Sequence, residues 1–298
     1  MTLALSSHVH LGRPLSAHGL ALVPLFPATP PVPFADLAQA VADDRASVEE
    51  EEAPTVPSLR VRNKADQALL VVEGALLIGG LQDRICGRPT WLPARSDGSV
   101  PVHCVEARRW QRRGGAGAGF RAERADVGLR HARLQQRADQ GATWRLVAER
   151  RRQAGLADES GSIGEVWDMA AVERLAGGLD LPWGACGVVV AWSHVGVSRW
   201  PLIEWYASPS AFRAAWPGLR RSMLGAHLAR VPHGTGAPAP RVALSDVALL
   251  LAKVDRPATV ESHGAGPGAV ASRFQRGCME GWATRVGERL VHVGAVRA

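Results

Sequence analysis

The sequence is poor in lysine and tyrosine, and it lacks the motifs that mark many soluble enzyme families. Only Lys64 and Lys253 accompany 33 arginines, and Tyr206 is the single tyrosine. The absence of G-x-S-x-G removes support for an α/β-hydrolase. There is no H-E-x-x-H pattern, and the closely spaced His8 and His10 lie in a terminal stretch. No motif therefore identifies a reaction, a cofactor or a metal site.

The cysteines are widely spaced, and no apolar run reaches the roughly 18 residues that a membrane span needs. None of the four, Cys86, Cys104, Cys186 and Cys278, is part of a C-x-x-C motif. This argues against a zinc ribbon or a disulfide scaffold and suits a reducing compartment. The N-terminus lacks the charged-then-apolar order of an export signal. We therefore expect a cytoplasmic protein that is not inserted in a membrane.

The composition that remains is typical of a globular protein. Hydrophobic residues make up 46% and charged residues 21% of the 298 residues. This length indicates one large domain or two fused smaller ones. A folded chain of this size buries roughly three quarters of its unfolded surface. Disorder, collagen and a coiled coil are thus excluded as descriptions of the whole chain.

The net charge of +7 comes from one segment. Residues 108–152 contain 13 arginines and four acidic residues, whereas the rest of the chain has 22 basic and 24 acidic residues. Such a segment favours phosphate-bearing partners. The hypothesis of a nucleic-acid partner depends on this segment alone. The helical spacing of Arg130, Arg133 and Arg137 would present one positive stripe. The alternative is a solvated connector in a sequence that uses arginine in place of lysine.

Short strand patterns dominate the first part of the chain. Ser58–Arg62 alternates apolar and polar residues, and Ala68–Glu73 is a continuous apolar run that suits a buried strand. Further short strand patterns follow as far as Glu106. The Gly/Ala run at residues 114–119 predicts an exposed loop.

Helices and strands alternate in the later part. Ser162 and Glu165 form a capping box ahead of a predicted helix. Residues 187–192 and 200–206 are predicted to form an antiparallel pair. Ser208 caps the next predicted helix, which Pro217 is expected to break or restart and which ends near Arg230.

These patterns predict an α+β, β-rich fold in three segments. Residues 1–112 form a β-sandwich-like half, residues 113–183 an Arg-rich helical segment, and residues 184–298 an α+β half. We expect the last to pack with the first as one architecture.

The densest group of polar residues lies at predicted strand ends. Our candidate ligand-binding residues are Glu73, Gln82, Arg84, His103, Glu106, Arg109 and Trp110. Alternation along the strand places Cys104 toward the core and His103 on the opposite face. One interpretation is that acidic and basic side chains only pair to satisfy strand ends. The other is a polar pocket in which an arginine binds an anion and a glutamate acts as base or orienter, with Glu73, Arg84, Glu106 and Arg109 converging.

The same residues carry a family resemblance. They lie in VRNKADQALLVVEGALLIGGLQDRICGRPTWLP, which begins at Val61, and in VPVHCVEARRW, which ends at Trp110. These stretches resemble the bacterial ARG and rhodanese-phosphatase-superfamily-associated protein domain family, whose pattern has L-E-G-E, then G-G-K-Q-N-R, then V-P-V-x-C-V-E-x-G-R-W. The resemblance extends over most of the chain and is strongest over residues 20–110. Ala75 replaces the second acid of L-E-G-E, so any role of that acid is lost here.

The resemblance implies an association with ADP-ribose and phosphate chemistry without defining an activity. We therefore expect a protein that binds an anionic, phosphate-bearing small molecule, such as a nucleotide or an ADP-ribose-like compound. The alternative is a non-catalytic interaction or structural module whose polar cluster only pairs strand ends.

Overall fold

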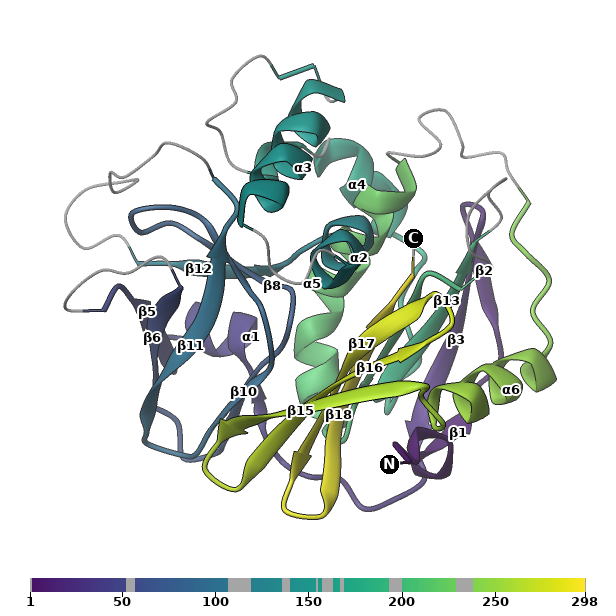
Figure 1. Cartoon of the computed structure of the whole chain (residues 1–298). Coiled ribbons are helices and arrows are strands. Elements are labelled where there is room, and N and C mark those ends of the chain that lie inside the picture. Colours follow the sequence, from purple (N-terminus) through teal and green to yellow (C-terminus); the bar gives the residue numbers. More distant parts are fainter. Residues whose placement is uncertain are drawn as a thin grey trace. The chain divides into compact units, whose positions relative to one another are not determined.

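The chain folds into two compact units in the computed structural model (Figure 1). Unit 1 comprises residues 1–33 and 170–298, and unit 2 comprises residues 34–169. The structure describes residues 2–51, 57–106, 119–135, 140–153, 155–156, 163–166, 169–192, 200–228 and 238–297. Ser162 and residues 114–118 of the predicted loop lie outside this part.

The protein is α+β and rich in strands, as the sequence predicts. Eighteen strands and six α-helices occur in the described residues. None of these helices is long and apolar enough to cross a membrane. The predicted segments 1–112, 113–183 and 184–298 are defined by composition along the chain. The two units are defined by contacts between residues in space.

Unit 1 is built on a nine-stranded sheet in which all neighbours are antiparallel. The order is β1-β3-β13-β14-β18-β17-β16-β15, with β2 also paired to β3. The strands are β1 (Val9–Leu11), β2 (Leu15–Ala17), β3 (Leu20–Pro27), β13 (Gly187–Trp192), β14 (Leu202–Tyr206), β15 (Thr259–Gly266), β16 (Ala269–Arg276), β17 (Met279–Val286) and β18 (Arg289–Val296). Strands from both ends of the chain therefore share one sheet, as the purple and yellow strands in Figure 1 show.

The central strand β13 shows why this sheet forms. Its six residues are all buried, as its apolar sequence requires. Val189 pairs with Val23 of β3 on one side and with Ile203 of β14 on the other. The predicted antiparallel pairing of β13 with β14 is confirmed.

The helices of unit 1 are η1 (Leu5–His8), α4 (Met169–Ala176), α5 (Pro209–Leu228) and α6 (Leu244–Val254). Helices α5 and η1 lie against opposite faces of this sheet. On one face, the ring of Phe212 in α5 lies 5.8 Å from the ring of Tyr206. Trp205 points to the other face because side chains alternate along a strand, and it contacts His8 at 5.6 Å.

Helix α5 begins and ends close to the predicted positions, but it is not interrupted. The Ser208 hydroxyl accepts a hydrogen bond from the Ala211 N–H at 3.2 Å. The expectation that Pro217 breaks the helix is wrong, because α5 runs through it to Leu228. An internal proline costs about 3 kcal/mol. Burial of large side chains such as Leu219 and Met223 offsets this, since each contributes roughly 1.5–3 kcal/mol.

Unit 2 contains two smaller sheets. A three-stranded sheet has the order β10-β7-β4, and a six-stranded sheet has the order β12-β8-β9-β11-β6-β5. The strands are β4 (Ala35–Asp36), β5 (Ala46–Glu49), β6 (Ser58–Asn63), β7 (Leu69–Val71), β8 (Ala75–Ile78), β9 (Arg84–Cys86), β10 (Thr90–Leu92), β11 (Asp97–Cys104) and β12 (Arg121–Arg124). The helices are α1 (Leu37–Ala42), α2 (Val127–Gln135), α3 (Gln140–Gln153) and the short η2 (Ile163–Val166).

An apolar cluster joins the six-stranded sheet to helices α2 and α3. Leu76 and Ile85 of the sheet pack with Leu129 of α2 and Val147 of α3. Side chains alternate along β9, so Arg84 and Cys86 face away from this cluster. This alternation sets the positions of the predicted polar residues.

Candidate functional site

Five of the seven predicted site residues lie in the described part of unit 2. Glu73, Gln82, Arg84 and Glu106 are buried, with at most 5% of their surface exposed. His103 on β11 is half-buried. Arg109 and Trp110 lie outside the described residues.

Glu73 is held by an arginine that the sequence patterns placed on a positive stripe. Its Oε2 accepts hydrogen bonds from Nε and Nη2 of Arg130, at 3.1 and 3.0 Å. Both side chains are buried, at 4% and 2% exposure. Gly74 follows in the turn with φ of +75°, and a Cβ there would lie 2.7 Å from Cδ of Arg130. Glycine therefore allows both the turn and the path of the arginine across it.

A second group of predicted residues meets around Gln82. Its Nε2 donates to the backbone oxygen of Glu106 at 3.1 Å, and its Oε1 accepts from Nη1 of Arg84 at 3.2 Å. The thiol of Cys104 donates to the same Oε1 at 3.0 Å. The Glu106 carboxylate accepts from the Asp83 N–H at 3.1 Å. Gln82, Arg84 and Glu106 are thus brought together, while the Glu73 carboxylate bonds to Arg130.

Two titratable groups near this network are shifted toward their neutral forms. Burial raises the pKa of the Cys104 thiol, which disfavours a nucleophilic thiolate. Burial, and secondarily the charge of Arg133, lowers the pKa of His103 to about 4. Arg133 is itself buried and donates from Nη1 to the Thr143 hydroxyl at 2.5 Å. Arg130 and Arg133 therefore do not form an exposed stripe on α2, and Arg137, the third residue of that prediction, lies outside the described residues.

The polar residues of these two groups bond to one another inside the fold. They connect the β7–β8 turn to α2 and the start of β9 to the end of β11. Such enclosed networks position strands and fix a unique packing. They offer little exposed polar surface to a ligand.

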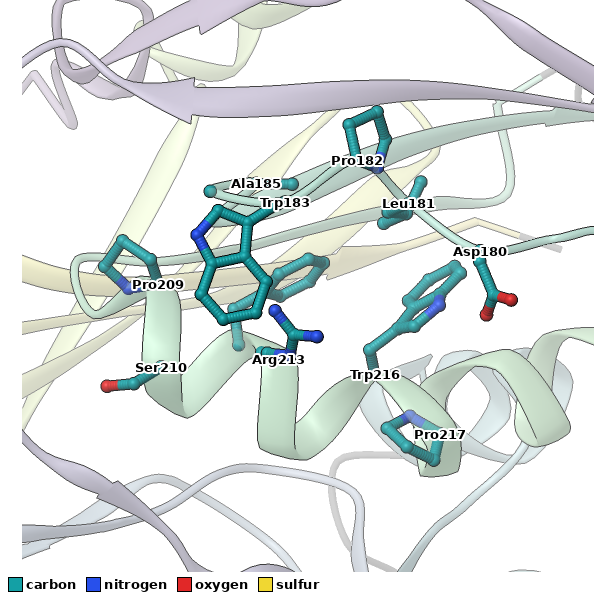
Figure 2. Close-up of a pocket in the computed structure, with 12 residues that line it drawn as sticks. Asp180, Leu181, Pro182, Trp183, Ala185, Pro209, Ser210, Arg213, Trp216 and Pro217 are labelled. Atoms are coloured by element: carbon teal, nitrogen blue, oxygen red, sulfur yellow. The ribbon is translucent and has the colours of Figure 1, made fainter.

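An open pocket lies elsewhere, in unit 1 (Figure 2), at a place that the sequence patterns did not indicate. Its volume is about 680 Å³, and it is bounded by residues 180–185 and the first half of α5. This volume falls within the range of small-molecule sites. Its lining is mostly apolar and includes Leu181, Pro182, Trp183, Phe212, Trp216 and Pro217.

Arg213 and Trp183 form the most distinctive pair in this pocket. The Arg213 guanidinium lies 3.6 Å from the centre of the Trp183 ring, a cation–π contact. The Trp183 side chain is 80% exposed. Arg213 forms no ion pair with an acidic residue in the described part of the chain. The guanidinium edge is therefore available to an anion.

Asp180, at the edge of the pocket, has a basic partner of its own. Its Oδ1 lies 2.6 Å from Nη1 of Arg220 on α5. The charge of Asp180 is thereby largely balanced, and Arg213 determines the sign of the potential inside. The start of α5 adds to this positive potential, because helix dipoles are positive at their N-termini.

Aromatic contacts connect the pocket wall to a buried polar group. Phe212 lies 6.0 Å from the Trp216 ring and 5.8 Å from the Tyr206 ring. Tyr206 contacts His292 edge-on at 4.8 Å, and His292 Nε2 lies 3.0 Å from Glu204 Oε1. The wall of the pocket thus rests on a tightly packed layer of the sheet.

One local signal could have indicated this pocket. Trp183 stands between Pro182 and Gly184, and proline and glycine mark turns. A large aromatic residue at a turn is more exposed than usual. Arg213 gives no comparable signal, because its partner is 30 positions away in the sequence.

Comparison with known proteins gives one match. The family model described as ARG and Rhodanese-Phosphatase-superfamily-associated Protein domain matches residues 8–296. No curated protein and no solved structure matches the chain.

Proposed function

This chain belongs to the ARG and rhodanese-phosphatase-superfamily-associated protein domain family, and on that premise we propose that it binds an anionic, phosphate-bearing small molecule in the pocket of unit 1. Nucleotides and ADP-ribose-like compounds are members of this class. The family description supports the proposal only through its mention of a phosphatase superfamily. The observation that carries it is the exposed guanidinium of Arg213, seated over Trp183 inside the pocket.

Electrostatics supports an anion at this position. Arg213 lines the pocket and has no acidic partner among the described residues, whereas Asp180 is paired with Arg220. Guanidinium groups bind phosphate and carboxylate oxygens through charge-assisted hydrogen bonds. The apolar walls lower the local dielectric constant and strengthen that attraction.

The predicted cluster of unit 2 is better explained as a structural network. Glu73, Gln82, Arg84 and Glu106 are buried and hydrogen-bonded within the fold. This observation favours the alternative in which the cluster pairs strand ends. A nucleic-acid role of the Arg-rich segment is also disfavoured. Four of its arginines, Arg124, Arg130, Arg133 and Arg151, are buried and cannot contact a phosphate backbone.

Calorimetric titration with inorganic pyrophosphate, ribose 5-phosphate and ADP-ribose tests the proposal. We expect at least one to bind, and Arg213→Gln to weaken that binding by roughly 10- to 100-fold, as loss of a charged hydrogen bond predicts. Arg276→Gln removes the same charge from an exposed site outside the pocket and should leave affinity unchanged. If no phosphate compound binds, or if Arg213→Gln has no effect, the proposal fails and the interaction-module alternative takes its place.

A further inference from the structure

We infer that the ligand of the unit 1 pocket carries a flat aromatic ring that stacks on Trp183, so that the pocket selects nucleotides over other phosphate compounds. The inference rests on the proposed function and deepens it. It rests on the exposed ring of Trp183, on the ring of Trp216 in the pocket wall and on the apolar lining between them.

Trp183 is held outward by a short, well-anchored turn. The Ala185 N–H donates to the Pro182 carbonyl at 3.2 Å, which closes the turn around Trp183 and Gly184. Gly184 has φ of +84°, a conformation that favours glycine. The next residue, Cys186, donates its N–H to Leu25 of β3 at 2.8 Å. The exposed indole is therefore fixed to the sheet rather than carried on a long loop.

One face of the Trp183 ring is covered and the ring as a whole is still 80% exposed. Arg213 lies over the ring at 3.6 Å. Tryptophan is usually well buried, because its large apolar surface is costly to hydrate. An exposed aromatic face of this kind can stack on a planar ring. Stacking on aromatic side chains accommodates any nucleic-acid base.

Trp216 supplies a second aromatic ring in the wall of the same pocket. It lies on α5 four residues after Phe212, and only 8% of its surface is exposed. Its Nε1–H is buried and has no acceptor in the described part of the chain. Because this atom has no surface open to the pocket, Trp216 offers a ligand apolar contact with its ring and not a hydrogen bond.

The arrangement of these side chains matches the two ends of a nucleotide. Figure 2 shows Trp183, Arg213 and Trp216 in a row above α5. The rings offer stacking and apolar contact, and Arg213 offers a cation for the phosphate. A bare phosphate would occupy little of the roughly 680 Å³ and would leave the apolar lining in contact with water.

Calorimetry with matched ligands separates the ring from the phosphate. Adenosine 5′-monophosphate and uridine 5′-monophosphate are compared with ribose 5-phosphate, on the wild type and on Trp183→Ala, Trp183→Phe and Arg213→Gln variants. We expect both nucleotides to bind at least about tenfold more tightly than ribose 5-phosphate. Trp183→Ala should weaken nucleotide binding roughly 5- to 150-fold, as loss of base stacking predicts, and leave ribose 5-phosphate unaffected. Trp183→Phe should retain most of the affinity.

Trp144→Ala is the matched control, because Trp144 is 38% exposed and lies in unit 2 outside the pocket. Equal affinity for nucleotides and ribose 5-phosphate, still dependent on Arg213, would overturn the ring inference and leave the proposed function standing. If the wild type binds no phosphate compound, both the proposed function and the ring inference are overturned. Competition by a proline-rich peptide that binds more tightly than any nucleotide would assign the pocket to a peptide and also overturn the inference.

Discussion

His292 Nε2 lies 3.0 Å from Glu204 Oε1, across two neighbouring strands and 88 positions of sequence. The side chains are 1% and 0% exposed. The Tyr206 hydroxyl donates to the same carboxylate oxygen at 3.4 Å, and the Tyr206 ring packs edge-on against His292. A carboxylate in this position depends on its neighbours for the hydrogen bonds that water would otherwise supply.

His292→Leu should therefore lower the free energy of unfolding by about 3–5 kcal/mol, as expected when one partner of a buried polar pair is removed. Adding Glu204→Gln should recover part of the loss, because no carboxylate is then buried without its histidine. Urea unfolding measures both variants, with Glu261→Gln on the exposed edge strand β15 as a neutral control. Additive losses in the double variant would show that the two side chains are not coupled.

Gly74→Ala tests the Glu73–Arg130 pair. The new Cβ would clash with the Arg130 side chain at 2.7 Å and also meet the cost of a positive φ, about 1–2 kcal/mol. Gly155→Ala is the matched control, since Gly155 has the same φ of +75° and a Cβ added there would have no atom within 4 Å. We expect Gly74→Ala to be more destabilising than Gly155→Ala by at least about 1 kcal/mol in urea unfolding of unit 2. Equal losses would mean that Arg130 moves aside without cost.

The lowered pKa of His103 leads us to expect a loss of stability in mild acid. Its pKa in the folded protein is lowered from 6.5 to about 4, so the unfolded chain binds a proton between these values and the folded chain does not. Stability should thus be insensitive to His103 above about pH 6.5 and fall as the pH drops toward 4. His103→Gln should flatten this part of the profile of unfolding free energy against pH. An unchanged slope in the variant would assign the acid sensitivity to other groups.

The thiols should differ sharply in reactivity. Burial raises the pKa of Cys186 to about 12 and also raises the pKa values of Cys86 and Cys104, whereas Cys278 is exposed. A chromogenic disulfide reagent at pH 8 should label one thiol rapidly in the native protein and four after unfolding. Cys278→Ser should abolish the rapid phase. Rapid labelling of a second thiol would show that one of the buried strands opens readily.

Local patterns were sufficient to predict many strands and the family, because each depends on neighbouring residues. The apolar run at 187–192 is bounded by polar residues and glycine, and it forms β13 at the predicted positions. The course of α5 through Pro217 was not predictable, because burial of the helix face outweighs the local cost of proline.

The site could be predicted only in part. Alternation and family pattern identified the buried group around Gln82, but they did not indicate that Glu73 would meet Arg130, which is 57 positions away. The pocket depends on a turn near Trp183 and a helix carrying Arg213. No periodic pattern in a sequence indicates a contact between a turn and a distant helix. This site could therefore be found only from the three-dimensional structure.

The pairing of β3 with β13 has a consequence for synthesis of the chain. Val23 can pair with Val189, at the centre of the sheet, only after Val189 has been synthesised. At typical elongation rates of about 5–20 residues per second, this delay is roughly 8–30 s. Unit 2 is meanwhile completed on the ribosome, because it occupies the continuous stretch 34–169. Strand β3 therefore exposes an apolar edge that chaperones can bind until about two thirds of the polypeptide has been made.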